Sequence, residues 1–212
     1  MNSDPSRTKD LKRTIRAEAR ARRRALGGKD AASRLICGRF AALPEYAAAG
    51  TVMFYVHFGD EVRTRQLVEQ AFGEGKEVVV PYCEAGVLKL FRLKSIDELA
   101  PGTWGIPEPK VEHRRRVDRR VEVRDLDLVM VPGVAFDRGG GRLGYGKGYF
   151  DKLLADAPSA TRLVAAAFEC QLFPEIPMLP GDVFMDKVIT EKAVYESFRP
   201  RSRGACRSAR GG

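Results

Sequence analysis

The sequence predicts a single-domain, layered α/β/α fold with a mostly parallel central sheet. Short apolar runs rich in β-branched residues alternate with segments of helical period along the 212 residues. The run LDLVMV at 126–131 is almost wholly apolar, as expected of a central strand that is covered on both faces. Because neither an internal repeat nor a linker interrupts this alternation, we expect one domain over residues 1–198.

The first third of the chain is expected to place one strand among helices. Residues 9–26 carry apolar side chains at helical spacing and end at two glycines, and residues 29–43 repeat that period as far as a proline. TVMFYV at 51–56 is rich in β-branched and aromatic residues, which is typical of a strand. A further helix is expected at 64–73. The apolar stripe of the first helix consists of Leu11, Ile15, Ala19 and Leu26.

The middle of the chain is expected to form two strands and a long loop. EVVVP at 77–81 is predicted to be a strand, and VLKLFRL at 87–93 alternates as a half-exposed strand does. Residues 101–120 begin with several prolines and glycines, which predicts a long surface loop. We expect the five arginines of 114–120 to face solvent.

The last third is expected to continue the alternation. A short helix is predicted at 149–157, a buried strand at 162–168 and a final strand at 186–191. The segment 199–212 is basic, small and rich in breakers, so we expect a disordered tail. Core positions are predicted for Phe136, Phe150 and Phe168.

The net charge of +9 is concentrated near the chain ends. Seven arginines and two lysines fall within residues 1–24, and five arginines follow Phe198. Basic segments of this kind are more often solvated than bound to nucleic acid, and no recognisable reading motif accompanies them, so nucleic acid is disfavoured as a partner. Scattered cysteines without a C-x-x-C pair, and the lack of a long apolar run, predict a cytoplasmic protein that does not contact a membrane.

The glycine-rich stretch GGGRLGYGKGYFD at 139–151 is the strongest chemical signal in the chain. Its spacing fits a nucleotide-binding P-loop, but Gly148 stands where that motif needs Ser or Thr. A dinucleotide fingerprint also fits its first glycines, although the stretch lies mid-chain, and a merely flexible loop is a third interpretation. The best physical account is a triphosphate cradle of backbone N–H groups, with Arg142 and Lys147 supplying positive charge.

Magnesium would then need oxygen ligands from outside the glycine stretch. Mg²⁺ favours one or two carboxylates together with phosphate and water. Asp151 follows the stretch directly, while Asp182 and Asp186 lie in the last third. Of these, Asp186 is expected to cap a helix instead.

MVPGVAFDRGGGRLGYGKGYFDKLL at 130–154 resembles the signature of the 5-formyltetrahydrofolate cyclo-ligase family, also called methenyltetrahydrofolate synthetases. Further segments are similar to the family's in the same order, so the resemblance covers about residues 9–195. These segments are KRTIR (12–16), DEVRT (60–64), GTWGIPEP (102–109), AFECQLFPEIP (167–177) and VITE (188–191).

The resemblance implies an α/β enzyme that closes 5-formyltetrahydrofolate to 5,10-methenyltetrahydrofolate, using ATP and Mg²⁺ and releasing ADP and phosphate. The formyl oxygen would be phosphorylated to an iminium phosphate, which nitrogen 10 of the folate then attacks. Such chemistry needs positioning and charge stabilisation rather than a protein nucleophile. That requirement agrees with the sequence, because neither His57 nor His113 has a triad-like context.

The resemblance also implies a role for individual residues. Arg142 and Lys147 would be the catalytic cations, and Asp151 and Asp182 the magnesium carboxylates. Many relatives carry His before the second carboxylate, where this chain has Gly181. ATP would be bound by Lys12, Arg13, Arg16, Arg142, Leu143, Gly144, Tyr145, Gly146, Lys147, Gly148, Tyr149 and Phe150. Folate would be bound by Val56, Glu61, Tyr145, Gly146, Lys147, Gly148 and Tyr149. The sole tryptophan, Trp104, lies in the loop rich in prolines and glycines, so we interpret it as a lid or wall of the folate site, with a surface anchor as the alternative.

Two other functions stay open at the level of sequence. One is a small-molecule kinase that uses the same glycine loop, and the other is a basic nucleic-acid-binding protein. For the enzyme we expect a monomer whose folate substrate can carry a polyglutamate tail. The arginines of 114–120 are a candidate contact for such a tail.

Overall fold

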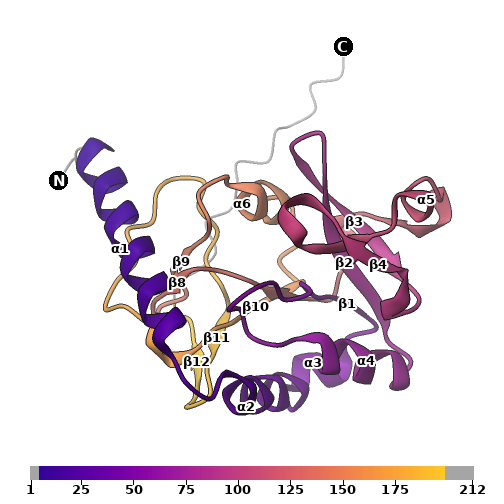
Figure 1. Ribbon diagram of the computed structural model, residues 1–212, viewed down its shortest axis with the longest axis horizontal. Helices are drawn as coiled ribbons and strands as arrows, with labels where there is room; N and C mark the ends of the chain where they lie inside the picture. Colours follow the sequence, from indigo (N-terminus) through magenta and orange to yellow (C-terminus); the bar gives the residue numbers. More distant parts are fainter. Residues whose placement is uncertain (1–4, 199–212) are drawn as a thin grey trace.

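An eight-stranded sheet crosses the molecule in the computed structural model, which describes residues 5–198 (Figure 1). The predicted tail at 199–212 lies outside the described residues. The five central strands run parallel, and antiparallel strands flank them, so the prediction of a mostly parallel sheet is confirmed. The strand order is β12 (Val194–Glu196), β11 (Lys187–Ile189), β10 (Arg162–Ala166), β7 (Leu128–Val131), β1 (Thr51–Met53), β2 (Glu77–Glu84), β3 (Val87–Leu93) and β6 (Arg120–Val121).

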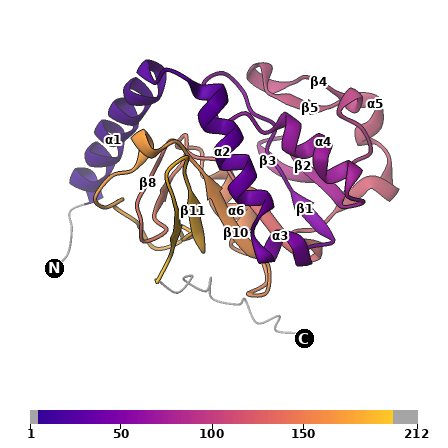
Figure 2. The same cartoon turned by 90° about the horizontal axis from the view of Figure 1, so that it is seen from below.

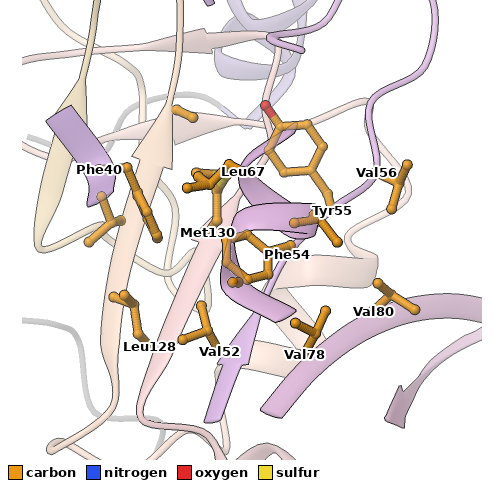
Figure 3. Close-up of a cluster of buried hydrophobic side chains, with 14 of the residues drawn as sticks. Phe40, Val52, Phe54, Tyr55, Val56, Leu67, Val78, Val80, Leu128 and Met130 are labelled. Atoms are coloured by element: carbon orange, nitrogen blue, oxygen red, sulfur yellow. The ribbon is translucent and has the colours of Figure 1, made fainter. Parts of the chain in front are cut away.

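Three helices cover one face of this sheet. They are α2 (Lys29–Ala41), α3 (Pro44–Ala48) and α4 (Arg65–Gly73), which Figure 2 shows over the strands. Figure 3 shows Phe40 and Leu67 of these helices among the valines and aliphatic side chains of the strands. Because side chains alternate along a strand, Val52 faces this cluster while its neighbour Met53 faces the other side of the sheet.

The second face carries one short helix, α6 (Tyr149–Leu154), together with irregular segments. Its core is formed by the alternate strand residues, such as Val129, Val131 and Leu163. The two covered faces explain why the strand sequences are so apolar. The opposed layers agree with the predicted layered fold, although the second helical layer is thin.

The first helix, α1 (Pro5–Ala25), stands at the end of the sheet (Figure 1). Ile15 and Ala19 of its predicted stripe are buried against a small hairpin of β8 (Ala135–Phe136) and β9 (Arg142–Leu143). Leu11 is exposed instead. Helix α1 therefore docks through a short apolar patch, which leaves the rest of its surface to its many cations.

Several elements differ from the sequence-based expectation. The strand predicted at 51–56 ends at Met53, and the strands predicted at 126–131, 162–168 and 186–191 are also shorter. The chain leaves the sheet at these points while its side chains remain buried, so apolar character overstates strand length. The stretch 101–120 is not a plain loop. It contains β5 (Pro107–Pro109), which pairs with β4 (Leu99–Pro101), and then α5 (Val111–Arg114) and β6.

The arginines of 114–120 are not all exposed, which corrects a second expectation. Arg119 is buried and pairs with Glu98 at 3.1 Å, and Arg114 pairs with Glu108 at 3.1 Å. Neither ion pair follows a helical or strand spacing that the local sequence would show.

The aromatic residues predicted to be core divide into two groups. Phe136 and Phe168 are fully buried, as expected. Phe150 is only half-buried, because it lies on the short helix that borders a cavity. Among residues 5–198, no helix has the length and apolarity needed to cross a bilayer.

Candidate active site

A cavity of about 600 Å³ opens beyond the carboxyl ends of the parallel strands. Val56 follows β1, Cys83 lies near the end of β2 and Pro132 follows β7, and all three line it. Ligands of open α/β sheets bind at this edge because loops from several strands converge there. Of the sequence-predicted site residues, the cavity brings together Lys12, Arg16, Val56, Glu61, Trp104, the whole stretch 142–150, Asp151 and Asp182.

The glycine stretch divides into two parts with different tasks. Its first glycines form the turn of the β8–β9 hairpin, where one carboxylate oxygen of Asp137 accepts hydrogen bonds from the N–H groups of Gly139 and Gly141, both at 2.8 Å. These donors are committed to the protein's own carboxylate. A Walker loop or dinucleotide fingerprint that begins at 139–141 therefore does not fit, and only residues 142–151 of the stretch line the cavity.

The second part of the stretch is anchored to α1. The carbonyl of Gly144 accepts a hydrogen bond from Arg16 Nε at 2.8 Å. Gly148 adopts a left-handed backbone with φ of 66° immediately before α6, a conformation that glycine reaches without steric cost. The Lys147 side chain is exposed between these two points, at the mouth of the cavity.

Both predicted magnesium carboxylates lie in the cavity, and each is paired with a predicted phosphate-binding cation. Arg142 donates to Asp151 Oδ1 at 2.7 Å, and Lys12 donates to Asp182 Oδ2 at 2.6 Å. The Arg142 side chain is only 2 % exposed, and its Nε has no hydrogen-bond partner among the described residues. A buried guanidinium with an unused donor is suited to an anionic ligand.

The same carboxylates fit magnesium. Among residues 5–198, no cluster of three or more His, Cys, Asp or Glu residues could hold a metal by itself. Two hard carboxylate groups completed by phosphate oxygens and water are, however, the ligand set that Mg²⁺ favours beside a nucleotide. Asp151 and Asp182 could therefore hold the ion together with a bound triphosphate.

The cations of α1 lie on different sides of the helix. Lys12 and Arg16 are four residues apart, share one face and line the cavity. Arg13 points away, is 80 % exposed and pairs with Asp10 at 3.1 Å, so the structure does not bring this predicted ATP ligand to the cavity.

Glu61 also lines the cavity and is held in place by two donors. Tyr145 donates its hydroxyl to Oε1 at 2.7 Å, and the N–H of Phe58 donates to Oε2 at 3.0 Å. Burial raises the pKa of Glu61, while these two hydrogen bonds oppose that rise by favouring the ionised form. A carboxylate fixed in this way can still accept N–H groups from a flat heterocycle through its remaining lone pairs.

The loop that carries Trp104 forms another wall. Trp104 is 65 % exposed and has a φ of 57°, which is uncommon for a residue with a side chain. The buried carboxylate of Glu108 ties this loop to β2, because it accepts hydrogen bonds from Cys83 N at 3.1 Å and Thr103 N at 3.3 Å. The sequence showed no sign of this role, since a Pro/Gly-rich stretch has no period to interpret.

Two further residues were misjudged or missed from sequence. Asp186 does not cap a helix, because its carboxylate accepts the N–H of Leu163 at 2.7 Å and so joins two strands of the sheet. Arg23, one of many arginines on α1, donates to the Tyr145 hydroxyl at 3.1 Å. Only three-dimensional packing distinguishes it from its neighbours.

The fold and cavity together define an α/β protein with a cation-rich ligand site at the carboxyl edge of its sheet. The model of the 5-formyltetrahydrofolate cyclo-ligase family matches residues 8–191, and the chain belongs to this family. It is 34% identical over 182 residues to a probable 5-formyltetrahydrofolate cyclo-ligase of Schizosaccharomyces pombe, covering 79% of this chain and 88% of the relative. The 5-formyltetrahydrofolate cyclo-ligase of Escherichia coli is 32% identical, with 84% of this chain and 98% of the relative covered.

A solved structure supports the same assignment. The 5,10-methenyltetrahydrofolate synthetase of Aquifex aeolicus superposes with a TM-score of 0.78 at 32% identity, covering 94% of this chain and 99% of the other. The fold and the enzyme family expected from the sequence are therefore confirmed.

Proposed function

We propose that this protein closes 5-formyltetrahydrofolate to 5,10-methenyltetrahydrofolate in a reaction driven by ATP and supported by Mg²⁺. The observation that carries the proposal is the pairing of Arg142 with Asp151 and of Lys12 with Asp182 in one cavity that also contains Glu61. Its cationic side suits a triphosphate, and its carboxylate and aromatic side suits a pterin ring. Family membership supports this choice of substrates.

The reaction needs ATP because the oxygen of the formyl group is a poor leaving group until it is phosphorylated. The γ-phosphoryl group passes from ATP to the formyl oxygen, which leaves ADP and an iminium phosphate. Nitrogen 10 then attacks the formyl carbon and loses its proton, and the carbon–oxygen bond breaks as phosphate departs. The product is an amidinium shared between nitrogens 5 and 10.

The chain supplies charge and orientation for these steps. Arg142, buried with an unused donor, would bind oxygens of the transferring phosphoryl group, and Lys147 at the mouth would add a second cation. Mg²⁺ held by Asp151 and Asp182 would neutralise charge on the phosphate chain. Ionised Glu61 would accept paired N–H donors of the pterin and fix the ring for attack.

The other properties of the enzyme are also proposals. We propose a cytoplasmic monomer, for which the free thiols of Cys37, Cys83 and Cys170 are consistent with a reducing compartment. The substrate would include folates with polyglutamate tails, since several arginines near the Trp104 loop are exposed. Gel filtration and a comparison of KM values between mono- and polyglutamates test these two points.

The decisive assay mixes the protein with ATP, Mg²⁺ and 5-formyltetrahydrofolate. The proposal expects the near-ultraviolet absorbance of the methenyl product to rise in step with ADP release. A kinase would instead consume ATP and leave a stable phosphorylated compound without that absorbance. A nucleic-acid-binding protein would show neither signal, and its salt-dependent binding to a random duplex would survive Arg142→Ala.

A further inference from the structure

Arg23 is a buried cation near the C-terminal end of α1. Its residue exposure is 8 %, whereas its neighbours Arg22 and Arg24 are exposed. Its guanidinium donates to the hydroxyl of Tyr145 at 3.1 Å and approaches the carbonyl of Gly133 at 3.5 Å. Within residues 5–198, no carboxylate forms an ion pair with it. Burying a cation is costly without compensation, so this placement calls for an explanation.

The contact decides which way the Tyr145 hydroxyl points. A guanidinium can only donate hydrogen bonds, so the Tyr145 oxygen must accept from Arg23. The single hydroxyl proton is then available for Glu61, whose Oε1 lies at 2.7 Å. The hydrogen bonds Arg23–Tyr145–Glu61 therefore run in one direction, from α1 through the glycine stretch to Glu61 in the lining of the cavity.

The positive charge of Arg23 also favours the ionised form of Glu61. Burial raises the pKa of Glu61, and the positive charge of Arg23 opposes that rise alongside the hydrogen bonds from Tyr145 and Phe58. Burial likewise raises the pKa of Tyr145 to about 12, which keeps the phenol protonated and able to donate at neutral pH. Ionised Glu61 is the form that can accept two N–H donors.

We infer that Arg23 is a positioning residue that sets Tyr145 and, through it, keeps Glu61 ready for the folate ring. The inference rests on the proposed function for the identity of that ring. It also gives a reason for a buried cation on α1 that pairs with no carboxylate among residues 5–198. Lys12 and Arg16 face the phosphate side of the cavity, whereas Arg23 serves the folate side.

Other charged and titratable groups surround this chain and must be considered in any pH experiment. The Arg20 guanidinium lies 5.3 Å from the centre of the Tyr145 ring, and Arg63 donates to the backbone carbonyl of Glu61. The charge of Glu61 also contributes to the raised pKa of the buried Tyr55. His57, in the same turn as Glu61, has its pKa lowered by burial and by two nearby arginines. All of these remain in place when Arg23 alone is changed.

The test measures folate binding directly, without ATP or turnover. Trp104 is the sole tryptophan and lines the cavity, so its fluorescence reports the binding of 5-formyltetrahydrofolate. The variant Arg23→Met keeps an unbranched buried side chain but removes the charge and the donors. The matched control is Arg24→Met, which removes the same charge from an exposed position one residue away.

The expected result is a pH-dependent loss in Arg23→Met alone. Its Kd for the folate should rise about tenfold at low pH, where the loss of this charge-assisted hydrogen bond leaves more of Glu61 protonated, and the rise should shrink as the pH increases and Glu61 ionises. Arg23→Lys should recover part of the affinity because it restores the charge. In a Tyr145→Phe background, Arg23→Met should have a smaller effect than in the unmodified protein, because the hydrogen-bonded path is gone and only the direct effect of the charge on Glu61 remains.

Two results would overturn the inference. One is a Kd–pH profile of Arg23→Met that coincides with that of Arg24→Met. The other is an undiminished effect of Arg23→Met in the Tyr145→Phe background, which would show that Arg23 acts by another path. If Arg23→Met does not fold, the profile of Arg23→Lys against Arg24→Met decides the matter. Failure of the proposed function is seen separately, as an absence of methenyl product from the unmodified protein.

Discussion

Arg142 and Asp151 form an ion pair of 2.7 Å in which the arginine side chain is almost fully buried. The pair joins β9 to α6 across the base of the cavity, and one donor of the guanidinium remains unused. Each group thus holds its partner in place before a ligand arrives. Breaking a buried pair leaves an uncompensated charge, so this contact links the fold of the glycine stretch to its chemistry.

Asp151→Asn should reduce turnover by two to three powers of ten, roughly 3–4 kcal/mol of barrier. The neutral amide binds Mg²⁺ poorly and no longer balances the charge of Arg142. The Mg²⁺ concentration for half-maximal rate should rise as well. Steady-state rates over a Mg²⁺ series test this, with Asp156→Asn, an exposed carboxylate just beyond α6, as the control. Unchanged turnover would show that Asp151 is not a metal ligand.

Lys12→Ala should raise the KM for ATP much more than the KM for the folate. Lys12 lines the cavity, and its removal also breaks the ion pair of 2.6 Å with Asp182. Arg13→Ala, next along the same helix, should change the ATP KM by less than about twofold, because surface ion pairs contribute little. Equal effects of the two variants would mean that the side of α1 on which a cation lies does not decide whether it binds phosphate.

The sequence predicted the parts of this molecule that local pattern determines. The strands predicted at 126–131 and 162–168 were identified, although with overlong bounds, because both faces of a central parallel strand are buried and apolar. The glycine stretch 139–151 was predicted to bind a ligand from its glycines and cations, although its first three residues do not line the cavity. What the sequence could not predict depends on contacts between distant residues, such as Arg23 with Tyr145 or Glu108 with Cys83. A guanidinium or carboxylate has the same local sequence signature whether it is buried or exposed.

The effect of Glu61→Gln on thermal stability should depend on pH. Burial raises the folded-state pKa of Glu61, so between the unfolded and folded values the native state binds more protons than the unfolded state. The contribution of Glu61 to stability is therefore greatest at low pH and is lost as pH rises through the folded pKa. The melting temperature of Glu61→Gln, measured relative to the unmodified protein, should increase from pH 5 to pH 8. Glu69→Gln, at an exposed position on α4, should show no such trend.

Gly148→Ser should damage the enzyme even though it restores the P-loop pattern on paper. A Cβ at this position would meet no other atom within 4 Å among the described residues, so the free protein has room for a side chain. The cost comes from the backbone, because a φ of 66° is left-handed and costs a residue with a Cβ about 1–2 kcal/mol. Relief of that strain would turn the peptide at the entry to α6 and move Lys147 and Asp151 away from the cavity.

The measurement for Gly148→Ser is kcat/KM for ATP, which we expect to drop clearly. Gly27→Ser is the control, because its φ is ordinary and the space around it is also open, and it should leave kcat/KM unchanged. Both variants are compared over a range of Mg²⁺ concentrations, since a serine hydroxyl at 148 could only help by contacting the metal. Full activity of Gly148→Ser across that range would show that the left-handed backbone at 148 is not required for catalysis, which would contradict this account of Gly148.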